Sequence, residues 1–461
     1  MDGPIVGHDA ATPPAAAAPA SAPAPMTPPP PGRRRWFALG GLLVGFAVTA
    51  VLALAGAGLL RGPAPTGTSR PARIALVDQT GALVTIAPDG SMPRHLGLPG
   101  GAFRFPAWSP DGTRVAAIGL DAQGGGLFVI ADAGDPAPQT APPPIYRSAD
   151  QPPFYLYWSP DSRQVTFLTA GADGLALRAA PAGGESAGVI VRRGSPFYWD
   201  WSGETRIIIH VGGGTTDAFV GEMDLDGTNV APADASPGRF QAPVVSTADR
   251  YRAYVVTGTD PAGEIIIAGA SAATRQRIPV RGATALGWNH VADELAFIDP
   301  AGLAALPLGP LRVVDAISGT VRLVLDGQVI AFYWAPDGRS IAALSLPGAR
   351  NPPVAGRDGV VFAATGTTIQ ANAADLRLTV VDAASSTVRW QRSVRLSDTF
   401  LQQVLPYFDQ YALSHRIWSP ASDAFVLPIV GADGVAHITV VPADGRDPRV
   451  IADGEIGFWS P

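Results

Sequence analysis

Short apolar runs separated by turn residues recur along residues 73–461. Runs at 114–118, 164–168 and 424–430 cluster or alternate apolar and β-branched side chains, and each is followed by a turn and further short runs. Asp and Gly mark many of these turns, as at 224–227, because they accept the backbone conformations of tight hairpins. The pattern predicts short antiparallel strands throughout this part of the chain.

A tryptophan-centred motif recurs in step with these strands. Trp-Ser-Pro-Asp-Gly at 108–112 returns as Trp-Ser-Pro-Asp at 158–161, and in divergent form as Trp-Ser-Gly-Glu at 201–204 and Trp-Asn-His at 288–290. Most copies are about 40–50 residues apart, a period typical of propeller blades with four strands each. We interpret the tryptophans as packing residues between neighbouring sheets, because indole offers a large apolar face. They are Trp108, Trp158, Trp201, Trp288, Trp334, Trp418 and Trp459.

The two ends of the repeat region complement each other. Strand-like runs at 74–78 and 83–87 have no tryptophan motif before them, whereas Trp459 has no strands after it. Pairing the last strand with the first would close a ring and remove both sheet edges. Counting the repeats, with the first and last sets joined into one blade, predicts an all-β propeller of eight blades. Seven is the alternative if the weak copy headed by Val245 is not a blade.

The motif also resembles a known family. Trp-Ser-Pro-Asp-Gly heads followed by a strand and an Asp-x-Asp-Gly turn are similar to the repeats of TolB-type β-propellers, which also occur in the propeller of dipeptidyl-peptidase-IV-like proteins. The resemblance covers residues 72–461. It implies an extracytoplasmic propeller that acts as an interaction or ligand-binding module. The copies at Trp201, which lacks the proline, and at Trp288 depart from the family pattern, which bears on where the blades begin and end and not on the fold.

The N-terminal region has a different composition. Residues 1–35 are rich in Pro and Ala and end in three arginines, which predicts a disordered tail. Residues 36–60 contain no charged side chain and are long enough to cross a bilayer, so they predict a transmembrane helix followed by a linker at 61–72. A cleaved signal peptide is the alternative, since Ala-Leu-Ala at 53–55 is similar to a cleavage site.

The arginine cluster orients the predicted span. Because Arg33, Arg34 and Arg35 adjoin its N-terminal end, we expect a cytoplasmic tail, an extracytoplasmic propeller and a location in the cell membrane. Gly41 and Gly45 fit the small-xxx-small pattern of associating membrane helices and suggest weak dimerisation.

Charge and composition narrow the chemistry. The chain has no Cys and no Lys, which excludes disulfides, thiolate metal sites and Schiff-base lysines. Its net charge of −6 leaves about −8 on residues 62–461, because residues 1–61 carry four Arg against two Asp. An acidic body lacks the basic surface that nucleic acid requires. Abundant Ala, Gly, Pro and Arg are typical of a high-GC bacterial genome.

No catalytic, cofactor or metal residue is assigned from the sequence. Gly-x-Ser-x-Gly at 184–188 places Ser186 between two predicted strands, without the helix that a nucleophile elbow needs. The six histidines are scattered. The oxygen-rich turn at 224–229 lacks the distal Glu of a calcium loop, so a hairpin turn explains it.

An insertion at about 347–414 breaks the repeat, because Trp334 and Trp418 are 84 residues apart. Its first part, 347–372, reads as a loop, and residues 398–414 predict an amphipathic helix. This helix either covers its own ring, which is the favoured interpretation, or docks onto a partner. The candidate partner-binding residues are Phe400, Leu401, Val404, Tyr407, Phe408 and Tyr411.

These observations predict a single-pass membrane protein whose propeller is a non-catalytic interaction or scaffolding module. The expected partner is a protein or another component of the cell envelope, and no cofactor is expected. The alternatives are a hydrolase or lyase with its site at the ring axis, or a sensor of a small molecule or ion.

Overall fold

The chain divides into two units, residues 1–69 and 70–461. The computed structural model describes residues 70–461 except 97–101, 122–123, 133–142, 173, 213–217, 234–235, 259–262, 271–272, 301–305 and 348–374. The predicted tail, membrane helix and Gly41/Gly45 contact lie outside the described residues, as do most of the linker and the first part of the insertion. Within the described ranges, no helix has the length and apolar character needed to cross a bilayer.

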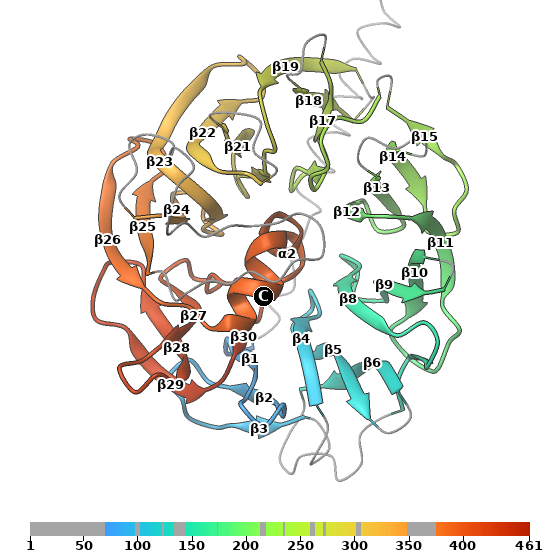
Figure 1. Ribbon diagram of the computed structural model, residues 1–461, viewed down its shortest axis with the longest axis vertical. Helices are drawn as coiled ribbons and strands as arrows, with labels where there is room; N and C mark the ends of the chain where they lie inside the picture. Colours follow the sequence, from blue (N-terminus) through green and yellow to red (C-terminus); the bar gives the residue numbers. More distant parts are fainter. Residues whose placement is uncertain are drawn as a thin grey trace, which may run out of the picture. The chain divides into compact units, whose positions relative to one another are not determined.

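The described residues of the second unit form antiparallel sheets arranged around a common centre (Figure 1). The first sheet joins the two ends of the ring, in the order β3-β2-β1-β30. Its strands are β1 (Ile74–Val77), β2 (Leu83–Ile86), β3 (Arg94–His95) and β30 (Ile456–Trp459). Ile74 pairs with Trp459, and Val77 pairs with Ile456. The predicted closure of the ring by its last strand is therefore confirmed.

Four further sheets contain four strands each, consecutive in the chain. The second comprises β4 (Ala102–Trp108), β5 (Arg114–Asp121), β6 (Gly124–Ala131) and β7 (Tyr146–Ser148). The third comprises β8 (Pro153–Trp158), β9 (Gln164–Gly171), β10 (Gly174–Pro181) and β11 (Val189–Gly194). The fourth comprises β12 (Phe197–Ser202), β13 (Arg206–Val211), β14 (Phe219–Asp224) and β15 (Ala231–Pro232). The fifth comprises β16 (Val244–Val245), β17 (Tyr251–Thr257), β18 (Gly263–Gly269) and β19 (Thr274–Val280).

The next sheet has seven strands because one long strand belongs to two repeats. Its members are β20 (Leu286–Trp288), β21 (Glu294–Ile298), β22 (Gly309–Asp315), β23 (Val321–Trp334), β24 (Ser340–Ser345), β25 (Leu376–Asp382) and β26 (Val388–Val394). The first half of β23 pairs mainly with β22, and residues from Val329 to Trp334 pair with β24. The last sheet holds β27 (Ala424–Val430), β28 (Ala436–Pro442) and β29 (Arg449–Asp453). An isolated bridge from Trp418 to Phe425 extends it inward.

Neighbouring repeats are tied by indole hydrogen bonds. Nε1 of Trp158 donates to the carbonyl of Ala107 at 3.0 Å, and Nε1 of Trp418 donates to the carbonyl of Tyr333 at 3.0 Å. The same bond runs from Trp334 to Gly287 and from Trp288 to Val244. In each case the accepting carbonyl belongs to the residue just before the first residue of the previous motif copy. The indole bond therefore has the same register in each of these pairs of neighbouring sheets. All seven motif tryptophans are buried.

The copy headed by Val245 takes part in this pattern. Although it has no tryptophan, its neighbour Val244 accepts the bond from Trp288, and β16 pairs with β17 as the other inner strands pair with theirs. A short apolar side chain therefore occupies the tryptophan position here without loss of the sheet.

The predicted helix over 398–414 forms as three shorter helical segments. They are a π-helical turn η1 (Phe400–Val404), a 3-10 turn η2 (Leu405–Tyr407) and the α-helix α2 (Phe408–Ser414). Pro406 lies in η2 and has no N–H to donate, which interrupts the regular helical hydrogen bonding. The strands β25 and β26 separate these segments from the first part of the predicted insertion.

The indole bond makes a testable contribution to stability. We expect Trp418→Phe to lower the free energy of unfolding by about 0.5–1.5 kcal/mol more than Trp201→Phe, because only the former removes a buried hydrogen bond, the one to the carbonyl of Tyr333. Trp201 is the matched control, since its buried Nε1 has no hydrogen-bond partner among the described residues. Urea denaturation of both variants measures the difference, and equal losses would contradict the role of the bond.

Candidate functional site

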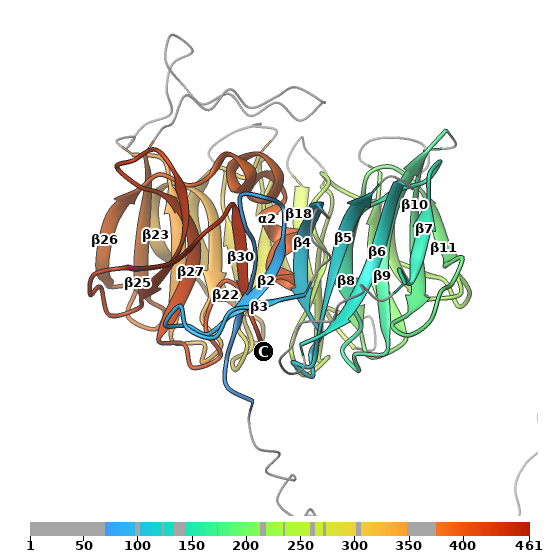
Figure 2. The same cartoon turned by 90° about the horizontal axis from the view of Figure 1, so that it is seen from below.

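The ring axis is occupied by the chain's own helix. Figure 1 shows α2 at the centre of the sheets, and Figure 2 shows it within the ring in side view. The ring of Phe408 packs against Phe332 and Tyr333 at centroid distances of 5.7 and 6.0 Å. On the other side, Tyr411 lies 5.1 Å from Tyr155 and 5.7 Å from Phe105. Apolar side chains of the helix thus contact inner strands of several different sheets.

Gln410 fixes α2 against β12. Its side-chain Oε1 accepts a hydrogen bond from the backbone N–H of Trp199 at 2.8 Å, and its Nε2 donates to the carbonyl of Trp199 at 2.9 Å. The amide therefore satisfies both backbone groups of one residue on the inner strand, as a paired strand would. Nε2 of Gln410 also donates to the hydroxyl of Tyr155 at 3.2 Å. These bonds hold the helix at a defined height and rotation.

The structure places most of the predicted partner-binding residues inside the ring. Five of the six are buried in the chain's own core: Phe400, Leu401, Val404, Phe408 and Tyr411. This placement argues against the alternative that these five residues form a surface for a partner, because the ring's inner strands already cover them. Tyr407 is the exception, with 49% of its surface exposed. The favoured interpretation, that the insert covers its own ring, is the one that the burial supports.

Two buried carboxylates join elements around the axis. Asp200 on β12 accepts hydrogen bonds from the hydroxyl of Tyr157 at 2.9 Å and from the N–H of Val245 at 2.7 Å, so it connects three neighbouring sheets. Asp409 on α2 accepts a bond from the N–H of Ala242 at 2.9 Å. Burial raises the pKa of each carboxyl to about 6, although these hydrogen bonds oppose the shift.

The sequence contained a signal for one of these carboxylates that our interpretation missed. Asp200 stands in the otherwise aromatic run Phe-Tyr-Trp-Asp-Trp at 197–201. A charged residue inside a predicted buried strand implies specific hydrogen-bond partners. Those partners lie on the two neighbouring sheets, 43 and 45 residues away in the chain, so the pattern indicates that they exist but not which residues they are.

Ser414 and His415 come closest to a catalytic arrangement. Oγ of Ser414 lies 2.6 Å from Nδ1 of His415 and 2.6 Å from the hydroxyl of Tyr155. Burial lowers the pKa of His415 to about 3, so its imidazole is a weak proton acceptor at neutral pH. In a catalytic triad, a carboxylate accepts a hydrogen bond from the histidine and orients it. Among the described residues, no carboxylate is hydrogen bonded to His415. This geometry suits a packing contact better than nucleophilic catalysis.

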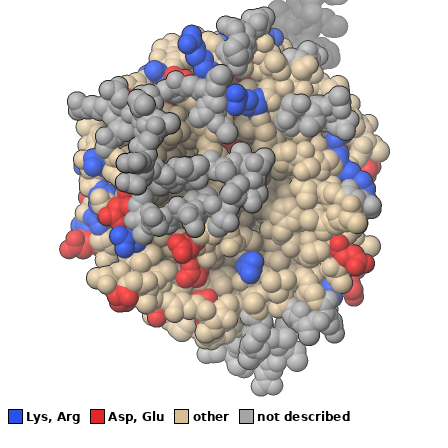
Figure 3. All heavy atoms as spheres, viewed as in Figure 1, with Lys and Arg blue, Asp and Glu red and all other residues tan. Residues whose placement is uncertain are grey.

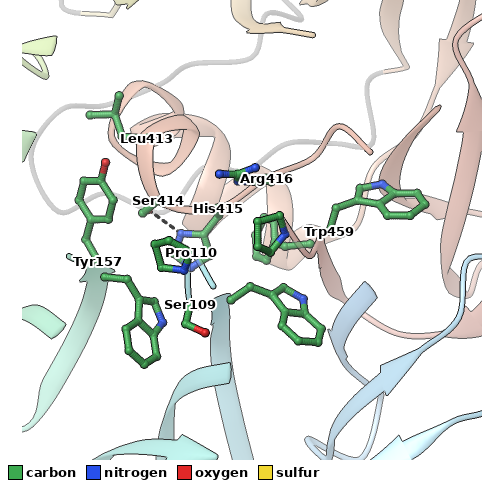
Figure 4. A pocket seen from close by; sticks show the side chains of 12 residues that line it. Ser109, Pro110, Tyr157, Leu413, Ser414, His415, Arg416 and Trp459 are labelled. Carbon is green, nitrogen blue, oxygen red and sulfur yellow. Dashed lines mark hydrogen bonds between the residues drawn. The ribbon is translucent and has the colours of Figure 1, made fainter. Parts of the chain in front are cut away.

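A small cavity opens at the end of the ring where the Trp-Ser-Pro motifs lie. Its volume is about 60 Å³, and we call it the axial mouth. Figure 4 shows Arg416 within it, with Tyr157 on one side and Trp459 on the other. The residues that line it include Ser109, Pro110, Tyr157, Ser414, Arg416 and Trp459.

A second cavity of about 320 Å³ lies at the opposite end of the ring. The register of the first sheet places it there, because Ile74 is opposite Trp459 and the lining residue Val77 is opposite Ile456. It is lined by the turn after β1, the start of β4 and residues of the insert. Its polar lining residues include Asp78, Thr80, Arg104, Thr399, Gln403 and Glu455.

The remaining candidates from the sequence lie in structural contacts. Ser186 sits in the turn between β10 and β11, where its Oγ accepts a hydrogen bond from the N–H of Gly188 at 3.1 Å. In the oxygen-rich turn, Asp224 pairs with Arg206 at 2.6 Å. Within the described ranges, metal-binding side chains do not gather in groups of three or more.

No family model matches the sequence, and no curated protein matches it. Solved structures similar to the chain include a putative TolB from Agrobacterium tumefaciens, with 18% identity and a TM-score of 0.36 over 58% of this chain and 95% of that one. TolB from Acinetobacter baumannii has 11% identity and a TM-score of 0.34 over 69% and 62% of the two chains. The dihydro-heme d1 dehydrogenase NirN has 13% identity and a TM-score of 0.48 over 86% and 76%.

The chain is similar to TolB and to other propellers. These similarities do not indicate a function for the chain, because the TM-scores are below 0.5 and the similar structures include an enzyme as well as TolB proteins. The assignment of the ring therefore rests on its own sheet topology and closure, and the function has to be argued from its own side chains.

The buried carboxyl of Asp200 predicts a pH-dependent stability. Its folded pKa of about 6 lies above the ordinary value of 3.8, so between these values the unfolded chain has released a proton that the folded chain retains. The folded state of the wild type therefore loses stability as pH rises through this window, by at most about 1.4 kcal/mol per pH unit from this group.

The side chain introduced by Asp200→Asn does not titrate. Subtracting the unfolding free energy of this variant from that of the wild type therefore isolates the contribution of the carboxyl. We expect the unfolding free energy of the wild type minus that of Asp200→Asn to fall as pH rises from about 4 to 6. Chemical denaturation across that range measures the difference, with the exposed Asp447→Asn as control. A difference that stays constant or rises with pH would show that the carboxyl is not held in its protonated form.

Proposed function

We propose that this protein is a membrane-anchored, extracytoplasmic β-propeller that acts as a non-catalytic interaction or scaffolding module in the cell envelope. The observation that carries the proposal is the insert at the axis. A propeller enzyme with its site on the ring axis would need its reacting groups in the space that α2 occupies (Figure 1). In this chain the helix fills that space with apolar side chains, and its polar groups are used in hydrogen bonds that hold the ring together.

The proposal includes eight blades. The seven-stranded sheet contains the strands headed by Trp288 and by Trp334, and β23 is shared between them. Counting the seven-stranded sheet as two blades, and the set headed by Val245 as one, gives eight blades. The participation of Val244 in the indole pattern favours this count over seven.

We place partner recognition on the end of the ring opposite the tryptophan motifs. The larger cavity lies there, and the side of the insert that is not buried contributes Thr399 and Gln403 to it. Tyr407, four residues farther along, is the most exposed aromatic side chain of the insert. On the face seen in Figure 3, most of the described surface is uncharged, with acidic and basic side chains interspersed, which is compatible with a protein partner.

Membrane topology is tested by cysteine labelling, since the chain has no natural cysteine. Val450 is 56% exposed on β29, so Val450→Cys should react with a membrane-impermeant maleimide in intact cells. Thr12→Cys, in the predicted tail, should react only after the membrane is permeabilised. Labelling of Thr12→Cys alone in intact cells, or recovery of the protein without the membrane fraction, would refute the anchored topology.

Partner binding is tested with a photo-crosslinking amino acid at Tyr407 in the full-length protein in its native membranes. We expect a stoichiometric crosslinked partner from this position. The matched control is Val189, which is 55% exposed on β11 at the outer edge of the ring and should give none. If neither position crosslinks and the protein purifies alone, the scaffolding proposal fails.

A further inference from the structure

We infer that the axial mouth is a binding site for a carboxylate group, with Arg416 as its main recognition residue. The inference does not depend on the proposed function, because a small carboxylate can occupy this mouth whether or not the opposite end of the ring binds a protein.

The backbone of Arg416 is fixed at the mouth. It directly follows His415, next to the C-terminal end of α2, and its carbonyl accepts a hydrogen bond from the N–H of Trp459 at 2.7 Å. An isolated bridge pairs the same two residues. The chain segment is therefore positioned by the closing strand of the ring and by the axial helix, which is the kind of support that a binding residue requires.

The guanidinium of Arg416 lacks a partner within the part of the chain that the structure describes. Other arginines in inter-repeat contacts have carboxylates beside them, such as Arg73 with Asp132 at 3.4 Å and Arg252 with Glu222 at 2.5 Å. No such hydrogen bond or ion pair is found for Arg416. An arginine keeps its positive charge under all ordinary conditions, so the exposed side chain of Arg416 is a cation without a protein partner in the described part of the chain. The mouth thus offers an uncompensated cation to a ligand.

Arg416 presents its charge to solvent at the mouth. Its side chain is exposed, and desolvation by neighbouring protein atoms lowers its pKa. A positive charge that lines a concave surface attracts anions from solution.

His290 lies within the electrostatic influence of Arg416. It occupies the position of the proline in the divergent Trp-Asn-His copy of the motif, which corresponds to Pro110 in the lining of the mouth. Desolvation and the charge of Arg416 lower the pKa of His290 to about 4, so the imidazole is neutral at neutral pH. A bound anion would screen that charge, and the pKa of His290 would rise.

The size and charge of the mouth favour a carboxylate over other anions. A volume of about 60 Å³ holds on the order of four water molecules, enough for a carboxylate and the carbon that bears it. The planar fork of a guanidinium matches a carboxylate with two parallel hydrogen bonds. One cation beside a neutral imidazole also matches one negative charge better than the two of inorganic phosphate. Ser414 and Tyr157 line the same space, but the hydroxyl of Tyr157 already donates to Asp200 and that of Ser414 contacts His415 and Tyr155, so recognition rests on the guanidinium.

The test uses the full-length protein in detergent micelles and follows the imidazole signal of His290 by NMR. Sodium acetate is the probe, acetamide is its uncharged counterpart and inorganic phosphate is the competing anion. We expect acetate to shift the signal in a saturable way and to raise the pKa of His290, whereas acetamide does neither.

Variants assign the effect to the arginine. Arg416→Gln should raise the Kd for acetate about tenfold or more, because charge-assisted bonds are lost. It should also raise the pKa of His290 without any ligand, since the cation that lowers it is gone. Arg416→Lys keeps the charge without the fork and should bind with intermediate affinity. Arg104→Gln, an exposed arginine at the opposite cavity, is the control and should bind acetate as the wild type does.

Three results would overturn the inference. They are the absence of a saturable shift with acetate in the wild type, equal affinity in Arg416→Gln, and tighter binding of phosphate than of acetate. Thermal melting verifies that each variant is folded. If Arg416→Gln does not fold, the comparison of Arg416→Lys with the wild type decides, and equal affinity of these two would also count against the site.

Discussion

The pairing of β30 with β1 is the contact on which the ring depends. It joins residues from the two ends of the described chain into one sheet, in which β1 has a partner strand on both sides. Arg73 extends the junction, since its N–H donates to Oγ of Ser460 at 3.1 Å. Once the ring is closed, each sheet has a neighbour on both sides, and the indole bonds can connect one repeat to the next.

Closure also creates the space that the insert fills. Inner strands that stand around a centre leave a channel, and an empty apolar channel would forfeit packing contacts along its whole length. The chain fills it with η1, η2 and α2, whose buried side chains include Phe400 and Phe408. Gln410, Asp409 and Asp200 then satisfy backbone groups that the inner strands present toward the axis. The polar groups at the axis are therefore explained by the requirement that buried donors and acceptors be paired.

Because the axis is filled, the two cavities described above lie at the ends of the ring. At one end lies the larger cavity, bordered by the exposed side of the insert. At the other end, the chain that leaves α2 brings Arg416 into the axial mouth, where motif residues of several repeats meet. The same insert thus decides what both ends present. This arrangement is why we propose recognition, rather than catalysis, as the role of the ring.

The sequence by itself determined the strands, their turns, the repeat and the closure of the ring. These features follow from local patterns: alternating apolar runs, Asp-Gly turns and tryptophans at a regular period. It also indicated an amphipathic insert at 398–414, although Pro406 divides the helix into three segments.

Only the tertiary structure decided which face of the insert is covered, and that five of its six candidate partner-binding residues are packed inside the ring. It alone brought Asp200 together with Tyr157 and Val245, and placed His290 near Arg416. The physical reason is that such contacts join different repeats, 43 or more residues apart in the chain. Their geometry depends on the radius of the closed ring and on the height of the helix within it, neither of which is encoded in any local pattern.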